Sequence, residues 1–350
     1  MKKIYILALS VLLIVIFFSM WYIDSMRSNN SGISTSTPVV VEKLKLDQKN
    51  SVNMLFVGDI MLDRTVRTTI EKNGFEYLFK NIESIFLDTD IAIGNLEGTI
   101  TSNKSLSQKD FSQLKFTFSS SVAKSLRDLG FTGMSLANNH SYDFGKDGFL
   151  ETMANVGVGN MFTFGSPLNN YNISKVVPVK DKQICYVGYH ELYDSKTEVI
   201  SKEITRLEPT CDFLIVFAHW GTEYKDTPTI AQTKEAHEFI DAGADLIIGA
   251  HPHVIQPVEI YKNKAIFYSL GNFIFDQDFS IATRVGLAVR LELTEDKVNF
   301  HLIPIEMYKN VLSFPEKEAV MGRMNLLISK LPNDLKTTAD VDSVFVLSRD

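Results

Sequence analysis

Acidic, amide and imidazole side chains follow several apolar runs of this sequence, at the position where each run ends. The residues concerned are Asp59, Glu97, Asn139, His140, His219, His251 and His253. The carboxyl ends of parallel strands meet at one edge of an α/β sheet, so we expect these side chains to converge there. Carboxylate, amide and imidazole ligands together suit manganese, iron or zinc. The sequence therefore predicts a site for one or two divalent ions.

Each of these residues taken alone also fits an ordinary structural role. An aspartate after a glycine, such as Asp59, commonly caps a helix or forms a turn. The pair Asn138-Asn139 is typical of a turn, and His219 beside a tryptophan fits a core histidine. The joint pattern favours a site, because four of the seven histidines stand at predicted strand ends in the expected order.

The other three histidines are interpreted as structural or left out of the site. His190 also ends an apolar run, but the glutamate and leucine after it offer no second ligand. His237 lies within a helical pattern, and His301 lies within a strand pattern. In the segment His251-Pro252-His253, the proline restricts His251 to extended geometry and stiffens the loop that would turn both imidazoles toward a metal pair.

Short apolar runs alternate with helical periodicity from residue 51 onward, which predicts a layered α/β domain. We expect strands at 52–58, 91–95, 133–138, 184–190, 213–219 and 245–249. We expect helices at 65–90, 120–129, 144–156, 230–242 and about 316–330. After residue 258 the pattern is rich in strands, which indicates a second sheet or an extension of the first. Residues after about 332 are interpreted as a dispensable tail.

The amino terminus predicts a membrane anchor. Residues 4–23 carry no charge, and twenty helical residues match a bilayer core of about 30 Å. Lys2 and Lys3 precede this run, so the amino terminus is expected to stay in the cytoplasm while the rest crosses. No cleavage site follows, which favours an uncleaved anchor. Residues 28–38 are rich in Ser, Thr, Asn and Gly and predict a flexible spacer, with a possible edge strand at 39–46.

Composition excludes some functions. The net charge is −7 and no Lys/Arg run occurs, so nothing indicates nucleic-acid binding. With 45% hydrophobic residues, the chain can bury a sizeable core. The two cysteines, Cys185 and Cys211, form neither a disulfide framework nor a thiolate zinc site. We interpret them as free thiols buried beside strands, although one disulfide is possible outside the cell.

Six motifs in order resemble the CapA/PgsA family of poly-γ-glutamate capsule biosynthesis proteins. They are GDIMLDR (58–64), GNLEGT (94–99), SLANNHSYDFG (135–145), AHWGTEY (218–224), GAHPHVIQP (249–257) and YSLGNFIFD (268–276). This family is similar to the calcineurin-like metallophosphoesterases. The resemblance implies a four-layer α/β/β/α sandwich with its site at the rim of the sheets. It covers about residues 51–305.

The resemblance also implies roles for single residues. Asp59 and His253 would bind a first metal, and Glu97 would stand at the position that bridges two metals. Asn139, His219 and His251 would bind the second metal. His140 and Asn139 would be catalytic, with His140 as the general acid or the donor to the transition-state oxygen. The residues assigned to substrate binding are Arg64, Trp220, Glu223 and Tyr224.

The sequence departs from the metallophosphoesterase pattern at the first motif. The superfamily usually has Asp-x-His, whereas here Asp59 is followed by Ile60 and Met61. A thioether is a poor ligand for a hard divalent ion, so the first metal lacks an imidazole. Glu97 is one methylene longer than the usual aspartate. We therefore expect the second metal to bind more tightly than the first.

Three functions remain open on the sequence alone. The first is a membrane-anchored, extracytoplasmic protein that supports synthesis, export or anchoring of poly-γ-glutamate or a similar anionic polymer, together with membrane-bound capsule synthesis subunits. The second is a metal-dependent hydrolase of phosphate esters or amides. The third is a binding module with a vestigial metal site. The predicted organisation is an anchor (1–27), a spacer (28–50), the CapA-like domain (51–310) and a C-terminal helix with its tail (311–350).

Overall fold

The computed structural model describes residues 51–193 and 196–349. The predicted anchor, spacer and edge strand at 39–46 lie outside the described residues. Within the described ranges, no helix has the length and apolar character that crossing a membrane requires.

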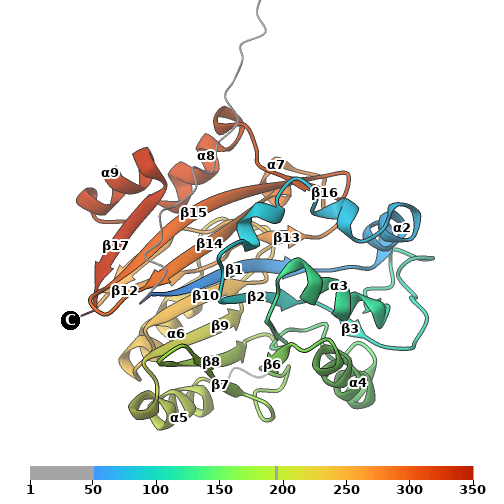
Figure 1. Ribbon diagram of the computed structural model, residues 1–350, viewed down its shortest axis with the longest axis horizontal. Helices are drawn as coiled ribbons and strands as arrows, with labels where there is room; N and C mark the ends of the chain where they lie inside the picture. Colours follow the sequence, from blue (N-terminus) through green and yellow to red (C-terminus); the bar gives the residue numbers. More distant parts are fainter. Residues whose placement is uncertain (1–50, 194–195, 350) are drawn as a thin grey trace, which may run out of the picture. The chain divides into compact units, whose positions relative to one another are not determined.

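The larger of two main sheets has nine strands (Figure 1). Its order is β16 (Val311–Ser313), β15 (Lys297–Tyr308), β14 (Val285–Leu293), β1 (Val52–Ile60), β2 (Ile91–Leu96), β5 (Gly133–Ser135) and β6 (Phe162–Phe164). Two further strands join off this path: β13 (Asn272–Ile274) pairs with β1, and β17 (Val344–Ser348) pairs with β15. Strands β1, β2, β5 and β6 run parallel, so their carboxyl ends share one edge.

The second main sheet has six strands. Its order is β11 (Val258–Tyr261), β12 (Lys264–Phe267), β10 (Leu246–Ala250), β9 (Phe213–His219), β8 (Lys182–His190) and β7 (Ser174–Val179). Strands β8, β9 and β10 are parallel neighbours, and their register places His190 opposite His219 and His219 opposite Ala250. A small two-stranded sheet joins β3 (Thr99–Ile100) to β4 (Thr117–Phe118).

The two main sheets pack against each other through an apolar core that we call the inter-sheet core. Alternate residues of β1 divide between two faces, as the pleat of a strand requires. Met54 and Phe56 enter the inter-sheet core together with Ile215 and Phe217 of β9. Leu55 and Val57 face a second core on the opposite side. Strand β1 is therefore buried on both faces.

Helices cover the two outer faces. One side is covered by α2 (Arg64–Asn73), α3 (Ser121–Leu129) and α4 (Gly145–Val158), with the 3₁₀ turns η1 (Glu76–Leu78) and η2 (Glu83–Phe86). The outer face of the six-stranded sheet is covered by α5 (Thr197–Leu207) and α6 (Ile230–Asp241), with η3 (Glu208–Thr210) after α5. Ile200, Ile204 and Leu207 form the apolar stripe of α5. The order helix, sheet, sheet, helix agrees with the layered α/β fold expected from the sequence (Figure 1).

Two predictions about elements are wrong. The periodicity at 65–90 gives one short helix, α2, and two 3₁₀ turns rather than a long helix. The segment after residue 332 is not a loose tail. After α7 (Ile281–Arg284) and α8 (Lys317–Leu327), the chain forms α9 (Asn333–Asp342) and then β17, whose Phe345 and Leu347 are buried in the inter-sheet core. Phe345 stacks on Phe300 of β15, with 4.8 Å between ring centroids.

Candidate metal centre

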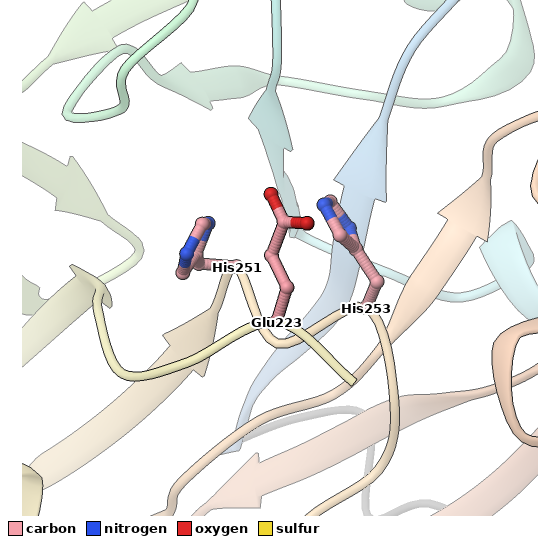
Figure 2. Close-up of side chains that lie close together, drawn as sticks. All are labelled: Glu223, His251 and His253. Atoms are coloured by element: carbon pink, nitrogen blue, oxygen red, sulfur yellow. The ribbon is translucent and has the colours of Figure 1, made fainter. Parts of the chain in front are cut away.

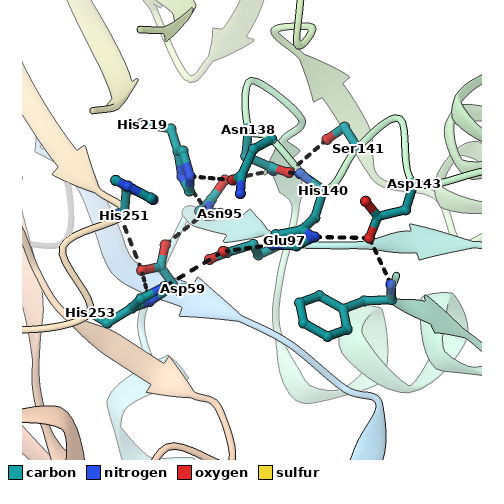
Figure 3. Close-up of polar contacts among 12 residues, drawn as sticks. Asp59, Asn95, Glu97, Asn138, His140, Ser141, Asp143, His219, His251 and His253 are labelled. Atoms are coloured by element: carbon teal, nitrogen blue, oxygen red, sulfur yellow. Dashed lines mark hydrogen bonds and ion pairs between the residues drawn. The ribbon is translucent and has the colours of Figure 1, made fainter. Parts of the chain in front are cut away.

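The predicted ligands meet where the carboxyl ends of the two main sheets adjoin (Figure 3). Asp59 is the second-to-last residue of β1, and Glu97 directly follows β2. From the other sheet, His219 is the last residue of β9, and His251 directly follows β10. All four side chains are buried, and so is His253. Both sheets therefore contribute to one rim site, as the apolar runs predicted.

Two groups of three side chains bring their ligand atoms within 4.8 Å of one another. The first group is Asp59, Glu97 and His219, all buried. The second group is Glu223, His251 and His253, of which Glu223 is exposed (Figure 2). This grouping differs from the family-based assignment, which put His219 with His251 and gave Glu223 to the substrate.

The tautomer of neutral His253 follows from its hydrogen bonds. Its Nδ1 lies 3.1 Å from Asp59 Oδ2 and 3.0 Å from Asn272 Oδ1, and both of these oxygens are acceptors. Nδ1 therefore carries the hydrogen, and Nε2 presents a lone pair. Nε2 lies 3.8 Å from Glu97 Oε1. A histidine whose second ring nitrogen donates to a carboxylate in this way is held in the tautomer and orientation of a metal ligand.

Two asparagines, absent from the predicted site, connect its parts. Asn138 Nδ2 donates to Asn95 Oδ1 at 3.0 Å, and Asn95 Nδ2 donates to Asp59 Oδ1 at 2.8 Å. The same Asn95 amide lies 3.1 Å from His219 Nδ1. Both asparagines are fully buried and stand one or two residues before a predicted ligand, which is the signal that could have found them. They position side chains of both sheets.

His219 and Asn139 hydrogen-bond to each other. Since Asn95 donates to Nδ1 of His219, the hydrogen of this imidazole is on Nε2, which donates to Asn139 Oδ1 at 2.8 Å. Burial, and next the nearby His251, hold the pKa of His219 well below its usual range. The imidazole is therefore neutral at pH 7. His219 and Asn139 would exchange their mutual hydrogen bond for coordination if both bind one metal.

His140 is oriented by a carboxylate. Its Nδ1 lies 2.9 Å from Asp143 Oδ2, which also accepts the Phe116 backbone N–H at 2.7 Å. The imidazole packs on the Phe116 ring, with 4.3 Å between centroids. Its Nε2 lies 3.9 Å from Glu97 Oε1, so it faces the ligand groups without belonging to either. An imidazole held at one nitrogen and presented at the other suits proton transfer.

Two buried polar atoms of the site have no hydrogen-bond partner among the described residues, and a bound cation would supply a partner for each. In the described part of the chain, Glu97 Oε2 and His251 Nδ1 are buried without a hydrogen-bond partner. Burial, and then the neighbouring Asp59, raise the pKa of Glu97 well above its usual value. Burial, and then His253, lower the pKa of His251 to about 3. Buried polar atoms rarely stay unpaired, and a divalent ion would satisfy both of these. The donor set therefore fits a metal.

The residues assigned to substrate binding separate in the structure. Trp220 does not line the site: its side chain is fully buried against α6, and its indole N–H donates to the Tyr268 carbonyl at 2.9 Å. Tyr224 is 46% exposed, and its ring lies beside His253, with 6.0 Å between centroids. Burial, and then Glu223, raise the pKa of Tyr224 to about 12. Tyr224 therefore stands at the mouth of the site as a neutral phenol.

Arg64 lies one aromatic layer away from the ligand groups. Its guanidinium pairs with Asp276 and sits over the rings of Phe116 and Phe275, at 5.1 and 5.4 Å from their centroids. Phe116 in turn packs on His140, and Phe275 on His253. Asp276 already neutralises this arginine, so Arg64 organises the wall of the site.

His190, which the sequence analysis left out, is brought beside the ligands. It is fully buried, and its ring centroid lies 5.7 Å from that of His219. Nδ1 donates to the Pro167 carbonyl at 2.8 Å, while Nε2 is buried without a hydrogen-bond partner among the described residues. Burial lowers the pKa of His190 to about 4. The signal was present: His190 ends its apolar run as His219 does.

The interpretation of the cysteines as free thiols is wrong. Cys185 of β8 and Cys211, two residues before β9, form a disulfide across 26 residues of sequence. The bond joins β8, which ends in His190, to the segment directly before β9, which ends in His219.

Comparisons with known proteins agree with the motifs. The chain is 29% identical over 310 residues to the "PGA biosynthesis protein CapA" of Bacillus subtilis (strain 168), covering 83% of this chain and 80% of that protein. It is 29% identical over 261 residues to the "Capsule biosynthesis protein CapA" of Bacillus anthracis, covering 69% and 64%. Among solved structures, the TT1561 protein of Thermus thermophilus is 11% identical, with 69% of this chain and 98% of that chain covered and a TM-score of 0.40, too low to support an argument.

The chain also matches a protein family. The family described as bacterial capsule synthesis protein PGA_cap matches residues 53–277, which include every side chain of the two ligand groups. The resemblance predicted from the six motifs is thereby confirmed. This chain belongs to the family of bacterial capsule synthesis protein PGA_cap.

Proposed function

We propose that this chain is a membrane-anchored, extracytoplasmic protein that supports the synthesis, export or anchoring of poly-γ-glutamate or a similar anionic polymer. The observation that carries the proposal is that the family match at 53–277 contains the whole rim site. The relatives in two Bacillus species are named for PGA and capsule biosynthesis. Membrane-bound capsule synthesis subunits are the partners that such a role requires.

Two observations support an extracytoplasmic location. Residues 4–23 are long and apolar enough to form an anchor, with two lysines on the side that stays inside. The Cys185–Cys211 disulfide is typical of proteins that fold in an oxidising compartment. The rim site would then lie on the side of the membrane where an exported polymer emerges.

The cofactor proposed for the rim is one or two ions of manganese, iron or zinc, which suit mixed nitrogen and oxygen ligands. Asp59, Glu97, Asn139, His219, His251 and His253 are the residues proposed to hold them. A bound divalent ion supplies positive charge and Lewis acidity at the rim. That charge also answers an electrostatic difficulty, because a protein of net charge −7 otherwise repels a polyanion.

One observation favours a second candidate function, a metal-dependent hydrolase of the metallophosphoesterase type. His140 is fixed by Asp143 at 2.9 Å, and its other nitrogen faces Glu97 at the edge of the ligand groups. Such an imidazole can donate a proton to a leaving oxygen or nitrogen. A module that only binds polymer has no need of a histidine oriented in this way. Turnover would act on a phosphate ester or on an amide bond of the polymer.

Genetic replacement tests the proposal and separates the two candidates. Deletion of the gene in its own host should abolish an extracellular polymer that releases glutamate on acid hydrolysis, and the unmutated chain should restore it. His219→Ala should fail to restore it although the protein is present in the membrane. His140→Asn should restore it if the site only binds, and should fail if turnover is required. Unchanged polymer after the deletion would refute the capsule role.

A further inference from the structure

The sequence left the first metal short of one ligand, and the structure shows that Met61 does not supply it. Met61 is fully buried in the apolar core on the helix side of the nine-stranded sheet. Its sulfur accepts the Asp63 backbone N–H at 3.1 Å. A thioether engaged in this way is a poor candidate for binding a hard divalent ion. A replacement ligand has to come from elsewhere.

Glu223 lies beside His253, which the resemblance assigned to the first metal. It belongs to the loop between β9 and α6, and Figure 2 shows its carboxylate between the imidazoles of His251 and His253. Ligand atoms of these three residues lie within 4.8 Å of one another. The next residue fixes the loop, because the Tyr224 N–H donates to the Pro252 carbonyl at 2.8 Å. The loop of Glu223 is thus tied to the turn that carries both histidines.

We infer that Glu223 is a metal ligand and completes a site with His251 and His253, an inference that rests on the metal centre proposed above. Each histidine has a nitrogen to offer: His253 Nε2 bears a lone pair, and His251 Nδ1 is buried without a partner among the described residues. Two imidazoles and one carboxylate form a recurrent binding set for divalent transition metals, with coordination positions left open.

The backbone of the turn supports the same inference. His251 and His253 have φ angles of 95° and 58°, in the left-handed region that residues with a β-carbon seldom adopt. The expectation that Pro252 restricts His251 to extended geometry is therefore wrong. Backbone strain of this kind concentrates at sites of function. The strained turn presents both imidazoles to the Glu223 carboxylate, instead of to opposite sides of an extended segment.

The two ligand groups then differ in access. Asp59, Glu97 and His219 are all buried, whereas Glu223 is exposed and closes its group from the solvent side. An ion would therefore enter or leave the site on the solvent side, where Glu223 lies. The ion bound by Glu223 would exchange faster than the ion bound by the buried group.

The test is a Mn²⁺ titration of the full-length protein, stripped of metal with a chelator, by isothermal titration calorimetry. The variants are Glu223→Gln, which keeps the shape and removes the charge, and Glu223→Asp, which keeps the charge. Asp226→Asn is the matched control, because it removes one negative charge from the same loop at a residue that pairs with Arg323 at 3.4 Å. His219→Ala serves as the reference for the buried group.

We expect Glu223→Gln to weaken one class of Mn²⁺ sites by about a hundredfold, at the upper end of what loss of an outer-shell partner costs. Glu223→Asp should be intermediate, and Asp226→Asn should bind like the unmutated protein. Metal-free melting curves should coincide for Glu223→Gln and the unmutated chain, since Glu223 is exposed.

Three results would overturn the inference. If Glu223→Gln binds Mn²⁺ as the unmutated protein does while His219→Ala does not, the metal centre stands and Glu223 is no ligand. If Asp226→Asn weakens binding as much as Glu223→Gln, the effect is long-range charge rather than coordination. If the unmutated protein binds no Mn²⁺, the inference fails together with the proposed metal centre.

Discussion

The two sheets contribute different chemistry to the same rim. The nine-stranded sheet supplies oxygen donors, with Asp59 from β1, Glu97 after β2 and Asn139 after β5. The six-stranded sheet supplies nitrogen donors, with His219 from β9 and His251 after β10. The buried group of Asp59, Glu97 and His219 combines ligands from both sheets. The centre therefore depends on how the sheets pack, which the inter-sheet core determines.

The two halves are also supported differently. On the oxygen side, buried amides hold the carboxylates, as Asn138 holds Asn95 and Asn95 holds Asp59. On the nitrogen side, a turn with positive φ angles presents His251 and His253, and the Pro167 carbonyl orients the neighbouring His190. Asn95 crosses between the halves by contacting both Asp59 and His219. Disturbing one half should therefore be felt in the other.

The largest expected effect comes from removing single imidazoles of the nitrogen half. His219→Ala and His251→Ala each take a ligand from a different group and should lower bound metal by about a hundredfold or more. Metal content after dialysis, measured by mass spectrometry, checks this. His237→Ala is the control. His237 of α6 pairs with Glu259 of β11 and lies outside the ligand groups. Full metal content in both site variants would show that the rim does not bind metal.

The second effect separates coordination from proton transfer. His140→Ala should leave metal content near that of the unmutated protein, because His140 belongs to neither ligand group. Any hydrolysis of a generic phosphodiester should slow by a factor of about 10²–10⁴, the usual contribution of a general acid. Metal analysis and an initial-rate assay on the same preparation give both quantities. Loss of metal from His140→Ala would instead make His140 a ligand.

The third effect loosens the packing between the halves. Phe345→Ala removes a ring that stacks on Phe300 and lies 6.2 Å from the Phe267 ring of the other sheet. The free energy of unfolding should fall by about 3–5 kcal/mol, the cost of truncating a buried aromatic residue. Chemical unfolding followed by circular dichroism measures it. Val346→Ala, at a neighbouring exposed residue of β17, should change stability little. Equal stability of all three proteins would restore the idea of a dispensable tail.

The smallest effect concerns acid. The pKa of His190 is about 4 in the folded protein, below the ordinary value of 6.5, so the unfolded chain takes up the proton more readily. The contribution of His190 to stability is present above pH 6.5 and is lost as the pH falls toward 4. Between pH 7 and pH 5, the metal-free protein should lose about 2 kcal/mol more than His190→Gln. Urea unfolding at both pH values with chelator present tests this, and equal losses would contradict it.

The sequence predicted those parts of the fold whose signal is local. Strands β1, β9 and β10, which position Asp59, His219 and His251, contain continuous apolar runs, and the predicted bounds of each agree with the structure within two residues. Strand β17 was missed because its apolar run covers only four residues, Val344 to Leu347, and forms a strand by pairing with β15. The disulfide was missed for a similar reason, since the pairing of β8 with β9 brings Cys185 beside the segment before β9 that contains Cys211.

The site was predictable to the extent that ligands follow strands. Asp59, Glu97 and the histidines at 219, 251 and 253 could be named from position alone. Trp220 was misassigned because an aromatic residue after a strand end can point into the core as readily as into a pocket. His190 was discarded for lack of a following ligand, yet parallel pairing with β9 sets it opposite His219. Neighbourhood across a sheet cannot be read from neighbourhood along the chain.

The pairing of β17 with β15 bears on the timing of folding. Residues 344–348 emerge from the ribosome after every other strand, yet Phe345 and Leu347 fill the core that holds the two sheets together. Contacts of this separation form late, because the intervening chain must be made first. The nascent protein therefore lacks part of its central packing until residues 344–348 have been synthesised.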